Sequence, residues 1–287
     1  MKLIPVFFFM TLLIPMKADA SKCPAGTTWN KSRLRCVRVS SKPLKIEMVK
    51  VGTGSFTMGW TDKYKKYRGY MPLTTIKITK KYMISKYEIT QDQYKSVTGK
   101  NPSVDSDCGG NCPVTNVTFL DAVNFCNLLS RKTGLSSCYT TDKRGDINWN
   151  RACSGYRLPT EVEWEYAARA GETGMGLKDL INYGRYASNS EKNGTPVLQP
   201  VGSLKPNAFG IYDMLGNVFE WTFSFYGNYS SSQGADPVHP QNPTSDRVFR
   251  GGCYASAKFA ASFSHRSFGA ETHKYKTIGF RVARNLK

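Results

Sequence analysis

Glycine and proline interrupt this chain so often that they constrain its fold more than any other feature. There are 25 glycines and 14 prolines among 287 residues, and the patterned stretches between them are short. Such punctuation argues against a helical bundle and favours an α+β domain with few helices, short strands and much irregular loop. Because 40% of the residues are hydrophobic and 13% are aromatic, the chain can still bury a substantial core.

Three segments carry helix-start signals, with a threonine at the N-cap position of each. Helices are therefore predicted from Thr90 to Gly99, from about Thr118 to Thr133 and from Thr160 to Gly171. Alternating apolar and polar residues predict a hairpin over Ile46–Met58 and short strands over Ile76–Ile84 and Tyr87–Ile89.

The N-terminal residues resemble a secretory signal peptide. Leu3 to Pro15 is almost entirely apolar, and Ala18-Asp19-Ala20 has the small-x-small form of a cleavage site. We expect cleavage after Ala20 and a mature protein in the periplasm or on the outer cell surface, between which the sequence does not decide. An uncleaved anchor and lipidation near Cys23 are the alternatives. The expected organisation is a signal peptide over 1–20, a leader or linker with a cysteine pair over 21–45, and one domain over 46–287.

All eight cysteines lie in the expected mature part, where an oxidising compartment allows disulfides. Three pairs bracket short polar or glycine-rich segments, which predicts the disulfides Cys23–Cys36, Cys108–Cys112 and Cys138–Cys153. Cys126 lies in an apolar helical pattern and is predicted to be a buried free thiol, and Cys253 is left unpaired as well. Zinc binding is disfavoured because there is no CxxC pair and there are only 3 histidines.

The chain is strongly basic, with a formal net charge of +19. Much of the excess lies in residues 41–100, where Lys63-Tyr64-Lys65-Lys66-Tyr67-Arg68 is the densest cluster. Such a cluster can attract nucleic acid, lipid headgroups or acidic glycans. We interpret it as a solvated basic face, with no nucleic-acid partner and with peripheral membrane contact left open.

Seven sequence blocks, in order, resemble the formylglycine-generating enzyme (sulfatase-modifying factor) family. They include Gly54-Ser55-Phe56-Thr57-Met58-Gly59, Arg157-Leu158-Pro159-Thr160-Glu161, Gly216-Asn217-Val218-Phe219-Glu220-Trp221, Arg250-Gly251-Gly252 and Gly279-Phe280-Arg281. The resemblance implies the irregular α+β fold of that family, a variant of the C-type lectin fold. It also implies a structural Ca²⁺ held around Asp213, Gly216, Val218 and Glu220, where hard oxygen ligands would suit the ion.

The resemblance stops at the catalytic cysteines. Formylglycine-generating enzymes hold copper with two cysteines that follow Arg-Gly-Gly, because two soft thiolates suit Cu(I). In this chain those positions are Ser256 and Ala261, and Cys253 is the only cysteine nearby. We therefore expect no copper and no catalysis. Oxygen-dependent formylglycine generation on sulfatase cysteines is the alternative function.

The segment 253–277 departs from the family although its flanks match it. It resembles the C-terminal segment of the variable proteins of diversity-generating retroelements, which is rewritten by reverse transcription at template adenines. Its aromatic residues and its small Ser, Ala and Gly residues have the composition of binding loops. We expect two or three of its five aromatic residues to pack inward. The predicted ligand-binding residues are Cys253, Tyr254, Ala255, Ser256, Phe259, Phe263, His265, Ser267, Phe268, His273 and Tyr275.

The resulting hypothesis is a secreted or surface-displayed, non-catalytic receptor or adhesin that presents a diversified surface on a sulfatase-modifying-factor scaffold. Its partner is expected to be a protein or glycan on another cell surface, whose identity the sequence does not give, and the protein itself is expected to be a monomer. A scaffold subunit that interacts through its basic face is a further alternative.

Overall fold

The structure is a computed structural model of the whole chain, which divides into two units, Met1–Leu44 and Lys45–Lys287. It describes the backbone of 27–30 and 35–38, and residues 44–60, 73–173, 179–229, 234–240 and 242–286. In the first unit, β1 (Thr27–Asn30) pairs antiparallel with β2 (Arg35–Arg38). The predicted signal peptide, the Cys23–Cys36 disulfide and the basic cluster at 63–68 lie outside the described residues.

The second unit has the three predicted helices within a few residues of their expected limits. They are α1 (Gln91–Thr98), α2 (Phe119–Lys132) and α3 (Glu161–Arg169). Each begins with a complete capping box, in which the threonine hydroxyl accepts from the backbone N–H three residues later. Short 3₁₀ turns are η3 (Ser106–Cys108), η4 (Leu180–Asn182) and η5 (Ala187–Asn189).

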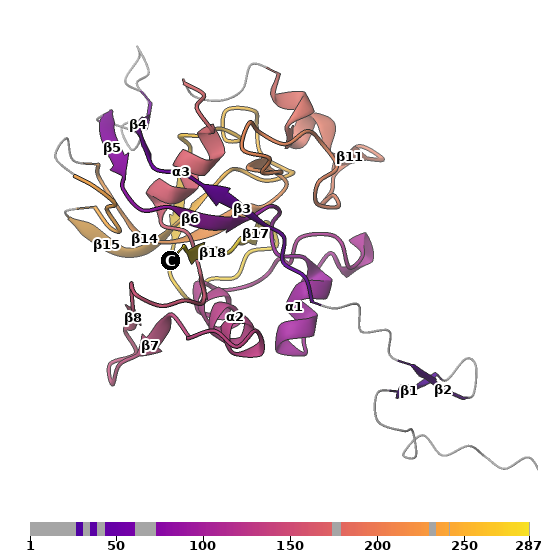
Figure 1. Cartoon of the computed structure of the whole chain (residues 1–287). Helices are drawn as coiled ribbons and strands as arrows, with labels where there is room; N and C mark the ends of the chain where they lie inside the picture. The colour runs from indigo at the N-terminus through magenta and orange to yellow at the C-terminus, as the bar shows by residue number, and fades with distance from the viewer. Residues whose placement is uncertain are drawn as a thin grey trace, which may run out of the picture. The chain divides into compact units, whose positions relative to one another are not determined.

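Two four-stranded sheets form the centre of this unit. The first has the order β3 (Met48–Val51), β6 (Tyr82–Ser85), β18 (Ala283–Asn285), β9 (Tyr156–Arg157). The second has the order β16 (Arg266–Gly269), β15 (Pro243–Arg250), β14 (Phe219–Gly227), β17 (Ile278–Gly279). In Figure 1, α1 and α2 lie together on one side of the sheet that contains β6 and β18, and α3 lies on the other.

Four two-stranded sheets complete the described fold. They are β4 (Gly54–Met58) with β5 (Thr74–Ile78), β7 (Tyr139–Thr141) with β8 (Ile147–Trp149), β10 (Gly184–Arg185) with β13 (Leu215–Gly216), and β11 (Glu191–Lys192) with β12 (Thr195–Pro196). The irregular α+β fold class predicted from the sequence is confirmed.

Two strand predictions are wrong. Ile46–Met58 is not a hairpin, because β3 pairs with β6 while β4 pairs with β5 in a different sheet. Tyr87–Ile89 is not a strand, because its backbone bonds are single contacts to separate loops: Ile89 N donates to Phe280 O, and Val114 N donates to Ile89 O. The predicted strand region Ile76–Ile84 contains parts of two strands, β5 and β6, which belong to different sheets. The alternation over Ile46–Met58 does mark two strands, but each pairs with a strand far away in the sequence.

The cysteine predictions hold wherever the structure describes them. Cys108–Cys112 and Cys138–Cys153 are disulfides, and Cys126 and Cys253 are buried free thiols. Within the described ranges, no helix is long and apolar enough to cross a membrane.

Candidate functional site

The segment 253–277 leaves the second sheet at the end of β15, through two glycines that the fold requires. Gly251 and Gly252 have φ values of 97° and 80°, in the left-handed region that favours glycine. A Cβ atom on Gly252 would lie 2.8 Å from the carbonyl oxygen of Ala260 and 2.9 Å from the Cα of Ala261. The chain therefore turns back on itself, and its next stretch passes directly against the glycine backbone.

Part of this segment belongs to the interior. Residues 260–264 are all buried, and Phe263 lies in the main core with Met58 and Trp164. Tyr254 is only 4% exposed and packs in a smaller apolar cluster with Leu198. Cys253 is 4% exposed. Three of the predicted ligand-binding residues, Cys253, Tyr254 and Phe263, are therefore buried and support the surface from beneath.

A network of buried charges holds the inner part of the segment in place. Arg250 donates through Nη2 to the carbonyl oxygen of Phe263 and, at 2.5 Å, to Oε2 of Glu165. Its Nη1 donates to Oε1 of Glu161 at 2.7 Å, and Arg266 donates to both oxygens of Glu161 at 2.6 and 2.8 Å.

The network is electrostatically matched. Burial by itself would raise the pKa of Glu161, but the guanidinium groups of Arg266 and Arg250 hold that pKa below its ordinary value. Both glutamates lie on α3. The helix therefore holds the segment at Arg266, which binds Glu161 directly, and at Phe263, through Arg250. Removing either arginine would leave a buried carboxylate with fewer cationic partners.

The other part of the segment faces solvent. Phe259, Phe268 and Tyr275 are 47%, 48% and 39% exposed. The prediction that two or three of the five aromatic residues turn inward is confirmed, since Tyr254 and Phe263 do so. Exposed aromatic side chains offer large contact areas at a small cost in side-chain entropy. We call these three residues, with the exposed Ala255 and His273, the display face.

Several aromatic residues of the display face rest on partners that set their orientation. Phe268 stacks on Tyr226 of β14 with ring centroids 4.1 Å apart, and Arg266 lies 4.7 Å from the Tyr226 ring. The Tyr275 hydroxyl and Nδ1 of His273 are 2.9 Å apart, within hydrogen-bonding distance. Tyr226 was missed in the sequence because it lies in a strand more than forty positions before Phe268. No local pattern connects the two.

His265 and Ser267 are half-buried at the edge of the display face. Burial, together with the nearby Arg250 charge, lowers the pKa of His265 to about 4. The imidazole is therefore neutral at neutral pH. Nε2 of His265 lies 3.2 Å from the Ser267 hydroxyl, so the pair offers a small neutral polar patch beside the aromatic residues.

The two positions that carry catalytic thiols in formylglycine-generating enzymes have other roles here. Ser256 is half-buried, and its hydroxyl accepts from the backbone N–H of Cys253 at 2.9 Å. Ala261 is 1% exposed and lies against Gly252. The Cys253 sulfur is 3.3 Å from the Ser256 hydroxyl. A pair of thiolates, which Cu(I) would need, is not available from these residues.

Among the four positions expected to hold calcium, the glutamate is already engaged by protein groups. Glu220 accepts from Arg281 on both carboxylate oxygens, at 2.7 and 2.8 Å, and from Trp164 Nε1 at 2.7 Å. Val218 is fully buried. Gly216 lies so close to β10 that a Cβ atom would be 1.9 Å from the carbonyl oxygen of Arg185. The Glu220 carboxylate that the ion would need is therefore already bound by Arg281.

Asp213 is different, because one of its oxygens is available. Its Oδ2 accepts from Gly202 N at 2.6 Å, whereas the buried Oδ1 has no hydrogen-bond partner. Glu88 has a buried oxygen in the same condition, and its second oxygen accepts from Asn217 at 3.2 Å. Burial raises the pKa of Asp213 to about 6, and burial with the nearby Asp213 charge raises the pKa of Glu88. These two carboxyls fit a cation better than Glu220 does.

Comparison with known proteins gives a consistent result. A family model described as the sulfatase-modifying factor enzyme 1-like domain matches residues 37–286. The structure of variable protein 1 from Treponema denticola superimposes with a TM-score of 0.74 at 29% identity, covering 83% of this chain and 95% of that one.

Two curated relatives extend the comparison. Chaperone protein LppX of Paenibacillus barcinonensis is 33% identical over 217 residues, which are 64% of this chain and 73% of the relative. The formylglycine-generating enzyme of Mus musculus is 32% identical over 160 residues, which are 48% of this chain and 42% of that enzyme. The chain thus matches less than half the length of the mouse enzyme.

Proposed function

The chain belongs to the sulfatase-modifying factor enzyme 1-like family, and from this premise we propose that it is a non-catalytic ligand-binding protein that uses the display face as its binding surface. Its similarity to a variable protein of Treponema denticola supports binding. Ser256 and Ala261, at the positions of the catalytic cysteines, argue against formylglycine generation.

One observation carries the proposal: the segment 253–277 is divided between a fixed interior and an exposed face. Phe263 is held in the core by Arg250, while Phe259, Phe268 and Tyr275 stand in solvent. A scaffold for variable binding needs this division, because the exposed residues can then change without loss of the fold.

The segment that carries the display face is cationic as well as aromatic. Lys258, Lys274 and Lys276 are exposed within the same segment. The segment's one acidic residue, Glu271, is engaged by Arg247 at 2.8 Å. Lys274 has a weak contact of 3.9 Å with Asp121 at the surface. This composition favours a partner that combines apolar area with negative charge.

The expected signal peptide supports a location outside the cytoplasm. We propose a secreted or surface-displayed monomer of the receptor or adhesin type, whose partner is a protein or glycan on another cell surface. Nucleic acid is not among the proposed partners.

Two matched libraries test this function. The first randomises the exposed residues Phe259, Phe268, His273 and Tyr275, and the second randomises the buried residues Tyr254, Ala260, Ala261 and Phe263. Both are displayed on yeast, scored for protease resistance, and selected against two unrelated purified proteins. We expect the first library to remain mostly folded and to yield binders to both targets, and the second to be mostly unfolded.

The proposal fails if the display-face library unfolds as often as the buried library. It also fails if a well-folded display-face library yields no binder to either target.

A further inference from the structure

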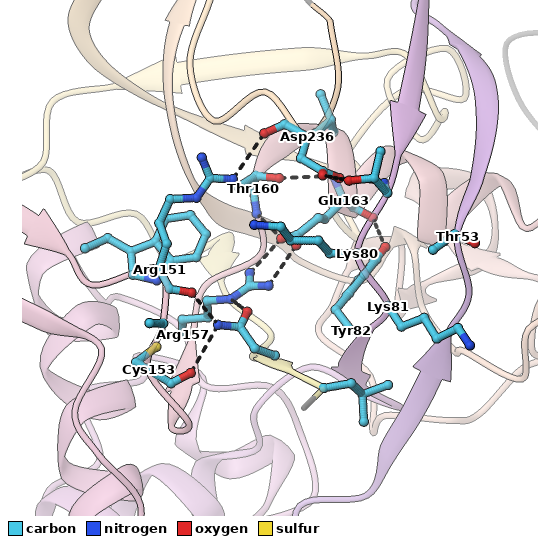
Figure 2. A pocket seen from close by; sticks show the side chains of 16 residues that line it. Thr53, Lys80, Lys81, Tyr82, Arg151, Cys153, Arg157, Thr160, Glu163 and Asp236 are labelled. Carbon is cyan, nitrogen blue, oxygen red and sulfur yellow. Dashed lines mark hydrogen bonds and ion pairs between the residues drawn. The ribbon is translucent and has the colours of Figure 1, made fainter.

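A cleft of about 500 Å³ lies away from the display face. Its walls come from the β5–β6 turn, the segment after β8, the start of α3 and the end of β18, and none of its lining residues belongs to 253–277. Figure 2 shows these side chains around a common space. The volume is in the range of small-molecule sites.

The charged side chains on the floor of the cleft bind one another. Arg157 is 2% exposed and makes a two-pronged pair with Glu163 at 2.6 and 2.7 Å. Its Nε donates to Asn285 Oδ1 at 2.9 Å, and its guanidinium lies 4.8 Å from the ring of the half-buried Trp149. The charges of Arg157 and Glu163 cancel, so neither is left to attract a ligand.

The walls carry cations that have no carboxylate partner among the described residues. Lys80, Lys81 and Arg151 are exposed, and no described acidic group lies within ion-pair distance of them. Figure 2 shows Lys80 and Arg151 extending from opposite sides, while Lys81 points outward.

Asp236, the remaining acid of the lining, is already engaged. Its Oδ1 accepts from the backbone N–H of Thr79 at 2.8 Å, and its Oδ2 accepts from the Thr79 hydroxyl. Arg151 reaches only the carbonyl oxygen of Asp236, at 3.3 Å, so most of its donors remain available for an anion.

We propose that this cleft binds an acidic saccharide, a sugar of about disaccharide size that carries a carboxylate or sulfate group between Lys80 and Arg151. Two inward-facing cations match one or two acid groups, whereas a nucleic-acid strand needs a longer track of positive charge. The lining mixes polar and apolar surface: Thr53 and Thr79 offer hydroxyl groups and Trp149 offers an aromatic ring, a combination that suits the hydroxyl groups and the apolar face of a sugar.

The test uses the whole protein and a chondroitin 4-sulfate disaccharide, with lactose and sodium sulfate as comparison ligands, in calorimetric titrations at low salt. The double variant Lys80→Glu/Arg151→Glu is compared with Lys100→Glu/Arg131→Glu. The second pair changes the charge equally, with an exposed lysine and an exposed arginine that makes one hydrogen bond, to Ser137.

We expect the cleft variant to bind the acidic disaccharide at least about tenfold more weakly than wild type, and the control variant to change affinity less than about threefold, since tenfold corresponds to 1.4 kcal/mol. Equal losses in both variants would indicate attraction by net charge alone and overturn the proposal. It is also overturned if lactose binds as tightly as the acidic disaccharide, or if sodium sulfate alone binds as tightly.

Discussion

Arg250 and Phe263, thirteen residues apart, are joined by a hydrogen bond from the guanidinium Nη2 to the phenylalanine carbonyl oxygen. The arginine is at the end of β15, and the phenylalanine is in the middle of the segment that carries the display face. Because the same guanidinium also binds Glu161 and Glu165 of α3, it connects the helix, the second sheet and this segment. The exposed aromatic residues are therefore presented from a fixed base.

Substitution by alanine should destabilise the protein much more at Phe263 than at Phe259. Phe263→Ala empties a fully buried site and should lower the free energy of unfolding by about 3–5 kcal/mol. Phe259→Ala removes a ring that is 47% exposed and should cost about 0.5–1 kcal/mol. Urea denaturation of both variants measures the difference, and similar losses would mean that Phe259 is also structural.

The Arg250 network should be essential for folding. Arg250→Met keeps the side-chain volume but leaves Glu161 and Glu165 with fewer cations, and should lower the free energy of unfolding by about 3–5 kcal/mol. Arg131→Met, on the exposed face of α2, should change it by less than about 0.5 kcal/mol. A result within 1 kcal/mol of wild type for Arg250→Met, about the size of a surface pair, would contradict the role assigned to this network.

The buried Asp213 should make stability fall as pH rises in the mildly acidic range. Its pKa is raised from 3.8 to about 6, so the folded protein keeps the proton at pH values where the unfolded chain has lost it. Its favourable contribution is complete below about pH 4 and is lost between about pH 4 and 6, with a total of about 3 kcal/mol. The difference in unfolding free energy between wild type and Asp213→Asn, followed over this range in chelator, measures the effect. A pH-independent difference would rule it out.

Calcium binding stays a prediction, with Asp213 and Glu88 as the better-suited carboxyls. We expect Ca²⁺ to raise the melting temperature of wild type at pH 7, where the ion would neutralise two buried carboxylates, and to leave Asp213→Asn unchanged. Mg²⁺ serves as the comparison ion. An identical melting temperature in Ca²⁺ and in EDTA, with no metal found by elemental analysis, would remove the site.

The protein should not convert cysteine to formylglycine. Ser256 and Ala261 provide no thiolate, so a peptide of the form Cys-x-Pro-x-Arg should yield no aldehyde with Cu(I) and oxygen. A formylglycine-generating enzyme assayed in parallel shows that the conditions support turnover. Aldehyde formation at catalytic turnover by this chain would contradict the proposed function and favour the enzymatic alternative.

Local sequence was sufficient for the helices and for the disulfides that the structure describes. Thr160 and Glu163 form their capping box from positions three residues apart, so the start of α3 is decided by neighbours. Cys108 and Cys112 are close for the same reason. The strands differ, because β3 and β6 pair over a distance that no local pattern encodes.

The sequence by itself determined the family scaffold, the missing catalytic thiols and the place of the departing segment, because these depend on residue identity and order. Only the tertiary structure decided which side of that segment faces solvent. Tyr254 and Phe268 are both aromatic residues in a segment whose sequence has no clear periodicity, yet one packs beside Leu198 and the other stacks on Tyr226 at the surface. Their burial depends on partners distant in the sequence, and those partners become neighbours only when the sheets and α3 have assembled.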